Sequence, residues 1–326
     1  PVIFLVKQYG WKDREVGDNV TNKLPSFVGN KINRVLFFHN RLVFLSNENV
    51  ICSRPGSISE PSFFAATALT VGATDPVDIS CASNYPSELY DAIETTSGLL
   101  CFSTNKQFLL SSDADVFNPD TAKLRAISSF NYNKNLPPIS TGLTYGFVDS
   151  SNKYSRFREI TDIKREGEPL IGETSLAIPT KLSKDINLLT NSRENSLIFL
   201  GTEGSDIVYG YRYMHDGKDY KQHAWFSWKH NNPIKYHFIV DDNYFFLDTD
   251  NFLQDLQLVQ ESEDASLTQD GENYLIHLDN WTTIYGGVYN SSTKVTTFTD
   301  GTNSCEFTWQ SSVTSPNGDL VLIDTN

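Results

Sequence analysis

Acidic side chains are the first residues in this sequence that could carry out chemistry. Paired carboxylates supply the acid and the nucleophile or base of glycoside hydrolysis, and the chain has 40 aspartates and glutamates among 326 residues. Four of them lie in or directly after apolar, strand-like runs and are candidates by position alone: Asp78, Asp149, Glu203 and Asp241. Because nothing in their neighbouring residues marks them, they support only an alternative hypothesis, a glycan hydrolase or lectin that acts on surface polysaccharide.

Three histidines are spaced as metal ligands on a helix would be. His223, His230 and His237 fall seven residues apart, which would place them on one helical face. Pro233 and the many aromatic residues around it instead indicate strand and loop. The alignment is then lost, and we expect no metal site.

Two aspartate pairs begin like calcium-binding loops. These pairs are Asp113-x-Asp115 and Asp248-x-Asp250. In both, phenylalanine stands at the fifth position and the glycine that makes the sharp turn is missing. We therefore interpret these carboxylates as turn residues.

An aromatic band could stack on a sugar ring. Trp225 and Trp228 stand in HAWFSWKH, after the alternating Tyr209, Tyr211 and Tyr213. Aromatic side chains also favour the half-buried surface of a strand, so the pattern favours core packing over a sugar platform.

No motif of a known catalytic site is present. The sequence has no GxSxG elbow, no phosphate-binding P-loop and no GxGxxG fingerprint. We predict no catalytic, cofactor-binding or metal-binding residue, and we expect that the protein is not an enzyme.

The four cysteines are expected to be buried thiols. Cys52, Cys81, Cys101 and Cys305 each stand in an apolar, strand-like run, and no two have CxxC spacing. Free cysteine behaves as a small hydrophobic residue, so we expect neither a zinc site nor a disulfide framework.

The net charge of the chain argues against tight binding to nucleic acid. At −14, the chain lacks the excess of lysine and arginine that tight nucleic-acid binding requires. It also has no apolar run of the roughly 18–20 residues that span a membrane, and its first residues lack the basic-then-apolar pattern of a signal segment.

Five hairpin candidates repeat along the chain. Each has three or four apolar residues, a polar turn and a second apolar stretch, and their starts lie 57, 44, 54 and 47 residues apart. This period, with about four short strands per unit, is typical of propeller blades; the alternative is a pair of β-sandwiches, which would not require even spacing. The hairpins are Leu42–Cys52, Leu99–Leu110, Leu143–Phe157, Leu197–Tyr211 and Tyr244–Leu256.

The repeat divides the chain into three parts. We expect an opening strand and linker over residues 1–30, an all-β, propeller-like domain of about five blades over 31–258, and a small additional β unit over 259–326 that begins a further portion of a longer chain. The only helix candidate is short, residues 61–68. In the first hairpin we expect Phe37, Phe44 and Leu45 in the core between blades and Asn47–Asn49 in the turn.

Four ordered blocks resemble the tail tubular protein B, or nozzle protein, family of short-tailed bacteriophages. The first is FVGNKINRVLFFHNRLVFLSNENVICSRPG, followed by Phe63-Phe64. DPVDIS (75–80), the block over 98–113 and VYGYRYMHDGKDYKQHAWFSW (208–228) follow in the family's order. The resemblance covers residues 27–258, and the last part of the chain matches only loosely.

The resemblance implies a structural protein of the virion tail. Six copies would form a tapering tube below the adaptor ring (tail tubular protein A), and the viral genome would pass through the tube without specific binding. Tail fibres would attach near the adaptor junction, and the distal end would face the host envelope. The family has no shared catalytic residues. Because DNA must slide, we expect aspartate and glutamate to face the channel, with sparse lysine or arginine at constrictions.

Overall fold

The structure is a computed structural model, and it describes most of residues 11–258 and several strands beyond them. The opening strand expected within the first ten residues, and Asp113 and Asp115, lie outside the described residues. The described ranges are 11–56, 61–112, 117–142, 144–150, 153–161, 163–164, 168–215, 220–241, 243–258, 268–269, 272–273, 280–290, 292–293, 295–299, 304–308 and 318–324.

The chain forms two compact units, Pro1–Leu258 and Val259–Asn326. The described residues are β strands, turns and loops, apart from one 3-10 helix, η1 (Thr174–Ala177). Residues 61–68, the helix candidate, are irregular instead. The predicted all-β, propeller-like fold is confirmed.

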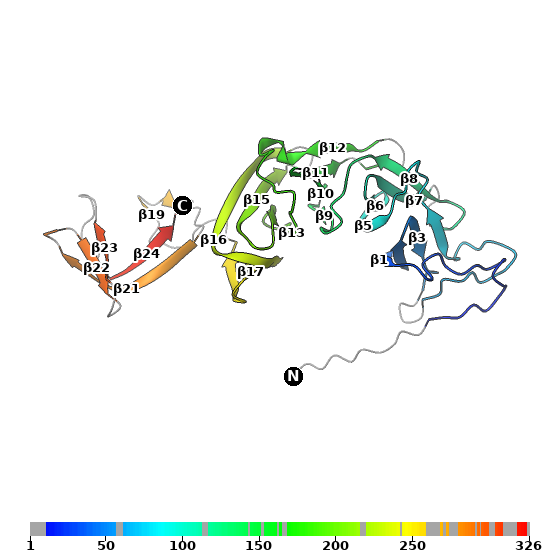
Figure 1. The fold of residues 1–326 in the computed structure, drawn as a ribbon, viewed down its shortest axis with the longest axis horizontal. Helices are drawn as coiled ribbons and strands as arrows, with labels where there is room; N and C mark the ends of the chain where they lie inside the picture. Colours follow the sequence, from blue (N-terminus) through cyan, green and yellow to red (C-terminus); the bar gives the residue numbers. More distant parts are fainter. Residues whose placement is uncertain are drawn as a thin grey trace. The chain divides into compact units, whose positions relative to one another are not determined.

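Unit 1 contains four antiparallel sheets that follow one another in chain order (Figure 1). The first sheet is β1 (Ile32–Phe38), β2 (Arg41–Ser46), β3 (Asn49–Cys52) and β4 (Val77–Ser80). The second is β5 (Leu89–Thr95), β6 (Gly98–Ser103), β7 (Gln107–Ser112) and β8 (Ala122–Ser128). The third is β9 (Ile139–Ser140), β10 (Tyr145–Ser150), β11 (Ser155–Thr161) and β12 (Leu170–Glu173). The fourth is β13 (Leu188–Ser192), β14 (Leu197–Gly201), β15 (Ser205–His215), β16 (Tyr220–Val240), β17 (Asn243–Asp248) and β18 (Leu253–Gln257).

The described residues of unit 2 form a two-stranded hairpin and a four-stranded sheet. The sheet has the strand order β23-β22-β21-β24. The hairpin is β19 (Thr268–Gln269) and β20 (Glu272–Asn273), and the sheet strands are β21 (Asn280–Asn290), β22 (Val295–Thr299), β23 (Ser304–Thr308) and β24 (Gly318–Asp324).

Consecutive sheets of unit 1 pack face to face. Strand β6 shows why its sequence is a continuous apolar run: side chains of a strand alternate between faces, and both faces of β6 are buried. Leu99 and Cys101 pack against the first sheet, whereas Leu100 and Phe102 pack against Phe147 of the third. In the same way, Ile198 and Leu200 of β14 pack with third-sheet residues such as Val148 and Phe157.

The fourth sheet curls so that it provides two layers. The first part of β16 pairs with β15 and the second part pairs with β17. Between them the register jumps from Lys229, opposite Ile207, to Ile234, opposite Ser205. The extra residues form a bulge that contains Pro233, and a bulge of this kind bends a strand sharply.

The curl encloses an apolar cluster. Phe199 and Val208 come from its first half, and Ile234, Tyr244 and Phe246 from its second half. The unit is therefore a stack of five layers, which correspond to the five predicted hairpins. The repeat pattern did not indicate that the fourth and fifth layers share one continuous sheet, because the bend depends on strand register.

The prediction for the first hairpin holds for only part of it. Leu45 is buried between the first and second sheets, as predicted. The prediction for Phe44 is wrong in its location: Phe44 is buried, but on the opposite face of the sheet, in a separate cluster with Ile51 and Phe63. The prediction that Phe37 is a core residue is wrong, because its side chain is 50% exposed. Successive side chains point to opposite faces, so Phe38 faces the core and Phe37 faces away from it.

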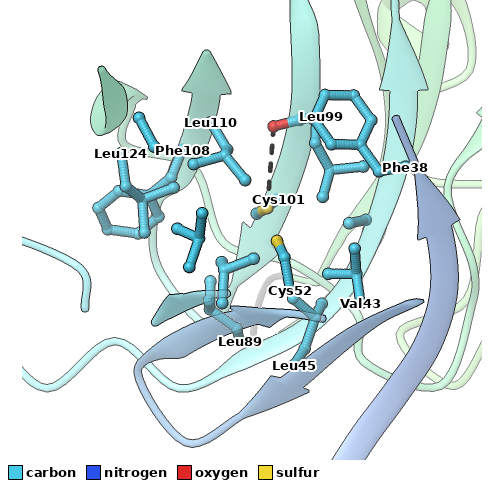
Figure 2. Close-up of a cluster of buried hydrophobic side chains, with 14 of the residues drawn as sticks. Phe38, Val43, Leu45, Cys52, Leu89, Leu99, Cys101, Phe108, Leu110 and Leu124 are labelled. Atoms are coloured by element: carbon cyan, nitrogen blue, oxygen red, sulfur yellow. Dashed lines mark hydrogen bonds between the residues drawn. The ribbon is translucent and has the colours of Figure 1, made fainter. Parts of the chain in front are cut away.

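Three cysteines lie in one apolar cluster between the first and second sheets. Cys52, Cys81 and Cys101 are free and buried, which confirms the prediction for these three. Figure 2 shows the sulfur atoms of Cys52 and Cys101 pointing toward each other across this cluster. Burial raises the pKa of the Cys52 and Cys81 thiols to about 12, so they stay protonated and unreactive at neutral pH. The side chain of Cys305 lies outside the described residues.

Phe199→Ala is expected to destabilise unit 1 by about 3–5 kcal/mol, because it removes a fully buried ring and leaves a cavity. The matched control is Phe37→Ala, which should cost less than about 1 kcal/mol at a half-exposed site. Urea denaturation followed by tryptophan fluorescence measures both. Equal losses would contradict the assignment of the two rings to core and surface.

The buried thiols should react with a thiol reagent such as DTNB only after unfolding. Cys52, Cys81 and Cys101 are expected to be unmodified in native protein and fully modified in concentrated denaturant. Mass spectrometry of peptides after alkylation identifies each site. Rapid native labelling of Cys52 or Cys101 would show that the first two sheets do not pack as described.

Candidate functional site

The four candidate carboxylates do not form one site. Asp78 on β4 accepts hydrogen bonds from Ser26 (2.7 Å, Oγ) and Asn49 (2.8 Å, Nδ2). Asp149 lies on β10 in the third sheet. Glu203 and Asp241 are exposed and stand in the β14–β15 and β16–β17 turns. The four carboxylates thus lie on three different sheets, and those of Asp78 and Asp149 are engaged by neighbouring side chains.

Asp149 is part of a buried ionic network. The Nε atom of Arg158 lies 2.9 Å from Asp149 Oδ2, and its Nη2 atom lies 3.3 Å from Glu173 Oε2. The guanidinium also stacks over the Phe130 ring at 4.3 Å from its centroid. Removing one partner of a buried pair is strongly destabilising. The ion pairs therefore join β10, β11 and β12 within the third sheet, and the ring contact connects that sheet to the segment after β8. They engage the Oδ2 atom of Asp149 and the Oε2 atom of Glu173.

A second buried arginine supports the first sheet. Arg41 is 2% exposed and donates hydrogen bonds to the carbonyl oxygens of Ser53 (2.8 Å) and Asp75 (2.7 Å). It reaches Phe117 next to the second sheet as well, where it donates to the carbonyl oxygen at 3.4 Å. This arginine satisfies carbonyl groups that burial would otherwise leave without donors. Sequence reasoning missed it, because a single arginine at the start of a strand carries no motif.

The histidines do not form a metal site in the described residues, where no group of three or more His, Cys, Asp or Glu side chains could hold a metal ion. His223 is exposed. His237 is 2% exposed, and its Nδ1 atom lies 2.9 Å from the Tyr244 hydroxyl. Burial lowers the pKa of His237 to about 3 and that of His230 to about 4. Both rings are therefore neutral core residues at pH 7.

Asp248 and Asp250 are turn residues. Asp248 accepts hydrogen bonds from the Phe252 N–H (2.9 Å) and from the side chains of Asn232 (3.3 Å) and Gln254 (3.2 Å). Burial acts to raise the pKa of Asp248, but the hydrogen bonds outweigh it and lower the pKa. Because Asn232 belongs to the bulge of β16, these bonds fasten the bend to β17 and β18.

The two tryptophans do not form a shared platform. Trp225 packs on Tyr211, with ring centroids 4.8 Å apart, and its Nε1 donates to the carbonyl oxygen of Thr174 at 3.0 Å. Trp228 packs on Phe199, also at 4.8 Å, inside the curl of the fourth sheet. Three positions apart on a strand, they face opposite sides and serve as core packing.

A cavity of about 500 Å³ lies against the outer face of the first sheet. Its lining includes Asp75 and Asp78. Asp75 accepts hydrogen bonds from the Ala66 and Gly72 N–H groups, and Asp78 accepts from Ser26. Both carboxylates hold neighbouring loops, so the cavity offers no unengaged acid for catalysis.

The buried histidines predict a loss of stability in mild acid. His237 has a folded-state pKa of about 3 against about 6.5 in an unfolded chain. The unfolded state therefore binds the proton first as pH falls below 6.5, and each such group contributes a slope of up to about 1.4 kcal/mol per pH unit. His237→Asn keeps a polar atom near Tyr244 and should reduce this slope.

Urea denaturation at a series of pH values between 7 and 4 measures the effect. His223→Asn is the control, because this exposed ring should leave the slope unchanged. An unaltered slope in His237→Asn would contradict the burial of a neutral imidazole.

Comparisons with known sequences agree with the resemblance found in the sequence blocks. A family model described as bacteriophage nozzle protein matches residues 3–325. The tail tubular protein gp12 of Escherichia phage T7 is 26% identical over 306 residues, which cover 90% of this chain and 37% of the T7 protein. The chain thus spans well under half the length of this relative.

Solved structures resemble the chain only distantly. Hsv2 from Kluyveromyces marxianus has a TM-score of 0.42 at 7% identity, covering 89% of this chain and 83% of that one. BamB from Moraxella catarrhalis has a TM-score of 0.33 at 11% identity, covering 71% and 70%. Such scores carry no functional argument. Within the described residues, no helix is long and apolar enough to cross a membrane.

The family model spans almost the whole chain, and the described polar clusters serve to hold loops, sheets and turns in place. The chain belongs to the bacteriophage nozzle protein family and is a structural protein of the virion tail.

Proposed function

We propose that this chain is a nozzle subunit, six copies of which form a tube below the adaptor ring of a short-tailed phage. The genome passes through this tube into the host. The family match over residues 3–325 is the observation that carries the proposal. The contacts of the buried polar groups are consistent with it, because Arg41, Arg158, Asp149 and Asp248 are all engaged in holding the layers and turns together.

The charge of the chain suits a channel through which DNA slides. Tight DNA binding comes from lysine and arginine that displace counterions from phosphates, and this chain has 26 basic against 40 acidic residues. An acidic wall repels phosphate and keeps the genome from adhering. We place aspartate and glutamate along the channel, with sparse basic residues at constrictions.

The same proposal defines the partners. They are further copies of the chain, the adaptor ring (tail tubular protein A) above, tail fibres near that junction and the host envelope at the distal end. Viral DNA is a passenger without a specific binding site. A stack of packed sheets suits this role, because it presents extended surfaces to neighbouring copies, and a repeated heterologous contact closes into a ring when the rotation closes.

Electron cryomicroscopy of the protein assembled with its adaptor ring tests this proposal. We expect a sixfold ring with an axial channel whose lining is net acidic. A monomer that cleaves glycans would contradict the assignment. A ring whose channel is rich in lysine and arginine would preserve the assembly but contradict the sliding mechanism.

A further inference from the structure

One sheet face of the fifth layer of unit 1 carries exposed apolar side chains. In the second part of β16 and in β17, His237, Ile239, Tyr244 and Phe246 point into the curl, so alternate residues point outward. The outward side chains pair across strands, Phe238 with Phe245 and Leu247 with Leu253. This fifth-layer face consists of Tyr236 (57% exposed), Val240 (50%), Leu253 (60%), Phe238, Phe245 and Leu247.

A second apolar strip lies at the opposite end of the stack. The cluster around Phe44 covers part of the outer face of the first sheet, but it leaves the edge strand β1 open. The first-layer strip consists of Val28 (52% exposed), Ile32 (37%), Val35 (53%) and Phe37 (50%). Contiguous exposed apolar residues of this kind mark interaction surfaces.

The two surfaces carry opposite charge. The sequence from Lys23 to Arg41 contains no acidic residue, in a chain whose net charge is −14. Of its four basic residues, Arg41 is buried and Arg34 pairs with Asp91, which leaves Lys23 and Lys31. The sequence from Tyr236 to Gln257 contains five aspartates and neither lysine nor arginine. On the first-layer side Lys23 and Lys31 are exposed, and on the fifth-layer side Asp241, Asp250 and Asp255 are exposed.

The two surfaces remain separate within one chain. No hydrophobic cluster of the described residues combines side chains of the first sheet with side chains of β16–β18. Each internal boundary of the stack, in contrast, is an apolar contact between two sheet faces. Within the described part of unit 1, the two ends thus have the apolar composition of layer boundaries, and neither packs on another sheet of that unit.

We propose that the fifth-layer face of one copy binds the first-layer strip of a second copy. This contact would continue the stack from chain to chain, with Asp255 and its neighbours facing Lys31 and Lys23. Because the two surfaces differ, the interface is heterologous, and its repetition gives a closed ring when the rotation closes. The inference rests on the proposed ring function and names the surfaces that hold the ring together.

Chemical cross-linking between two singly substituted proteins tests this contact. Val35→Cys protein and a tagged Val240→Cys protein are mixed and treated with a short bis-maleimide. We expect a heterodimer that contains both proteins. Mixing Val35→Cys with Leu170→Cys, which is 70% exposed on β12, should give none, and the wild-type protein shows the background of its own cysteines.

The cross-linking results distinguish a contact between two copies from a contact within one chain. No heterodimer above the Leu170→Cys background would overturn the inference. A protein with both substitutions that cross-links only within its own monomer would also overturn it, because the two ends would then close on each other. Circular dichroism checks that each variant folds.

A charge exchange provides an independent test. Asp255→Lys should weaken self-association in analytical ultracentrifugation, and Lys31→Glu in the same chain should restore part of it. A sixfold ring in microscopy that is unaffected by Val240→Asp or Asp255→Lys would leave the proposed function intact and overturn only this interface. If no ring forms and no cross-link forms, both proposals fail.

Discussion

Apolar packing between successive sheet faces is the interaction on which the rest of this structure depends. A sheet buried on both sides needs an apolar neighbour on both sides, and strands β6 and β14 show the result as unbroken apolar runs. Each layer therefore requires the layers beside it, as in other repeat proteins whose units cannot bury their faces alone. The buried arginines act at the margins of these boundaries, where Arg41 and Arg158 satisfy backbone and carboxylate oxygens that packing has removed from water.

The bend in β16 is the main departure from a simple repeat. One strand serves two layers because the bulge around Pro233 redirects it, and the second half then covers the aromatic cluster around Phe199. Asp248 holds the bend through Asn232 and Gln254. His237 and Tyr244 complete the interior with a hydrogen bond between them. Polar residues that resembled metal or calcium ligands in the sequence thus serve the geometry of this turn.

Local patterns in the sequence predicted the features that depend on neighbouring residues. The alternation of apolar runs and polar turns located all five hairpins, and apolar context identified the buried cysteines. Features that depend on register or on distant contacts were not predictable. Phe37 and Phe38 look equivalent in sequence, and only the pairing of β1 with β2 decides which one faces the core. The pairing of Asp149 with Arg158 likewise requires β10 and β11 to be aligned, and no spacing rule indicated it.

Apolar side chains fill the boundaries inside the stack, whereas those at its two ends are exposed. Assembly should therefore bury the ends and leave the interior unchanged. Hydrogen–deuterium exchange of dilute and assembled protein compares the two situations, because exchange protection reports local opening. The account predicts that β6, β10 and β14 are protected in both states, whereas β1, β17 and β18 gain protection only on assembly. Protection of β1 and β18 that equals that of β6 in the dilute monomer, or that does not increase on assembly, would contradict it.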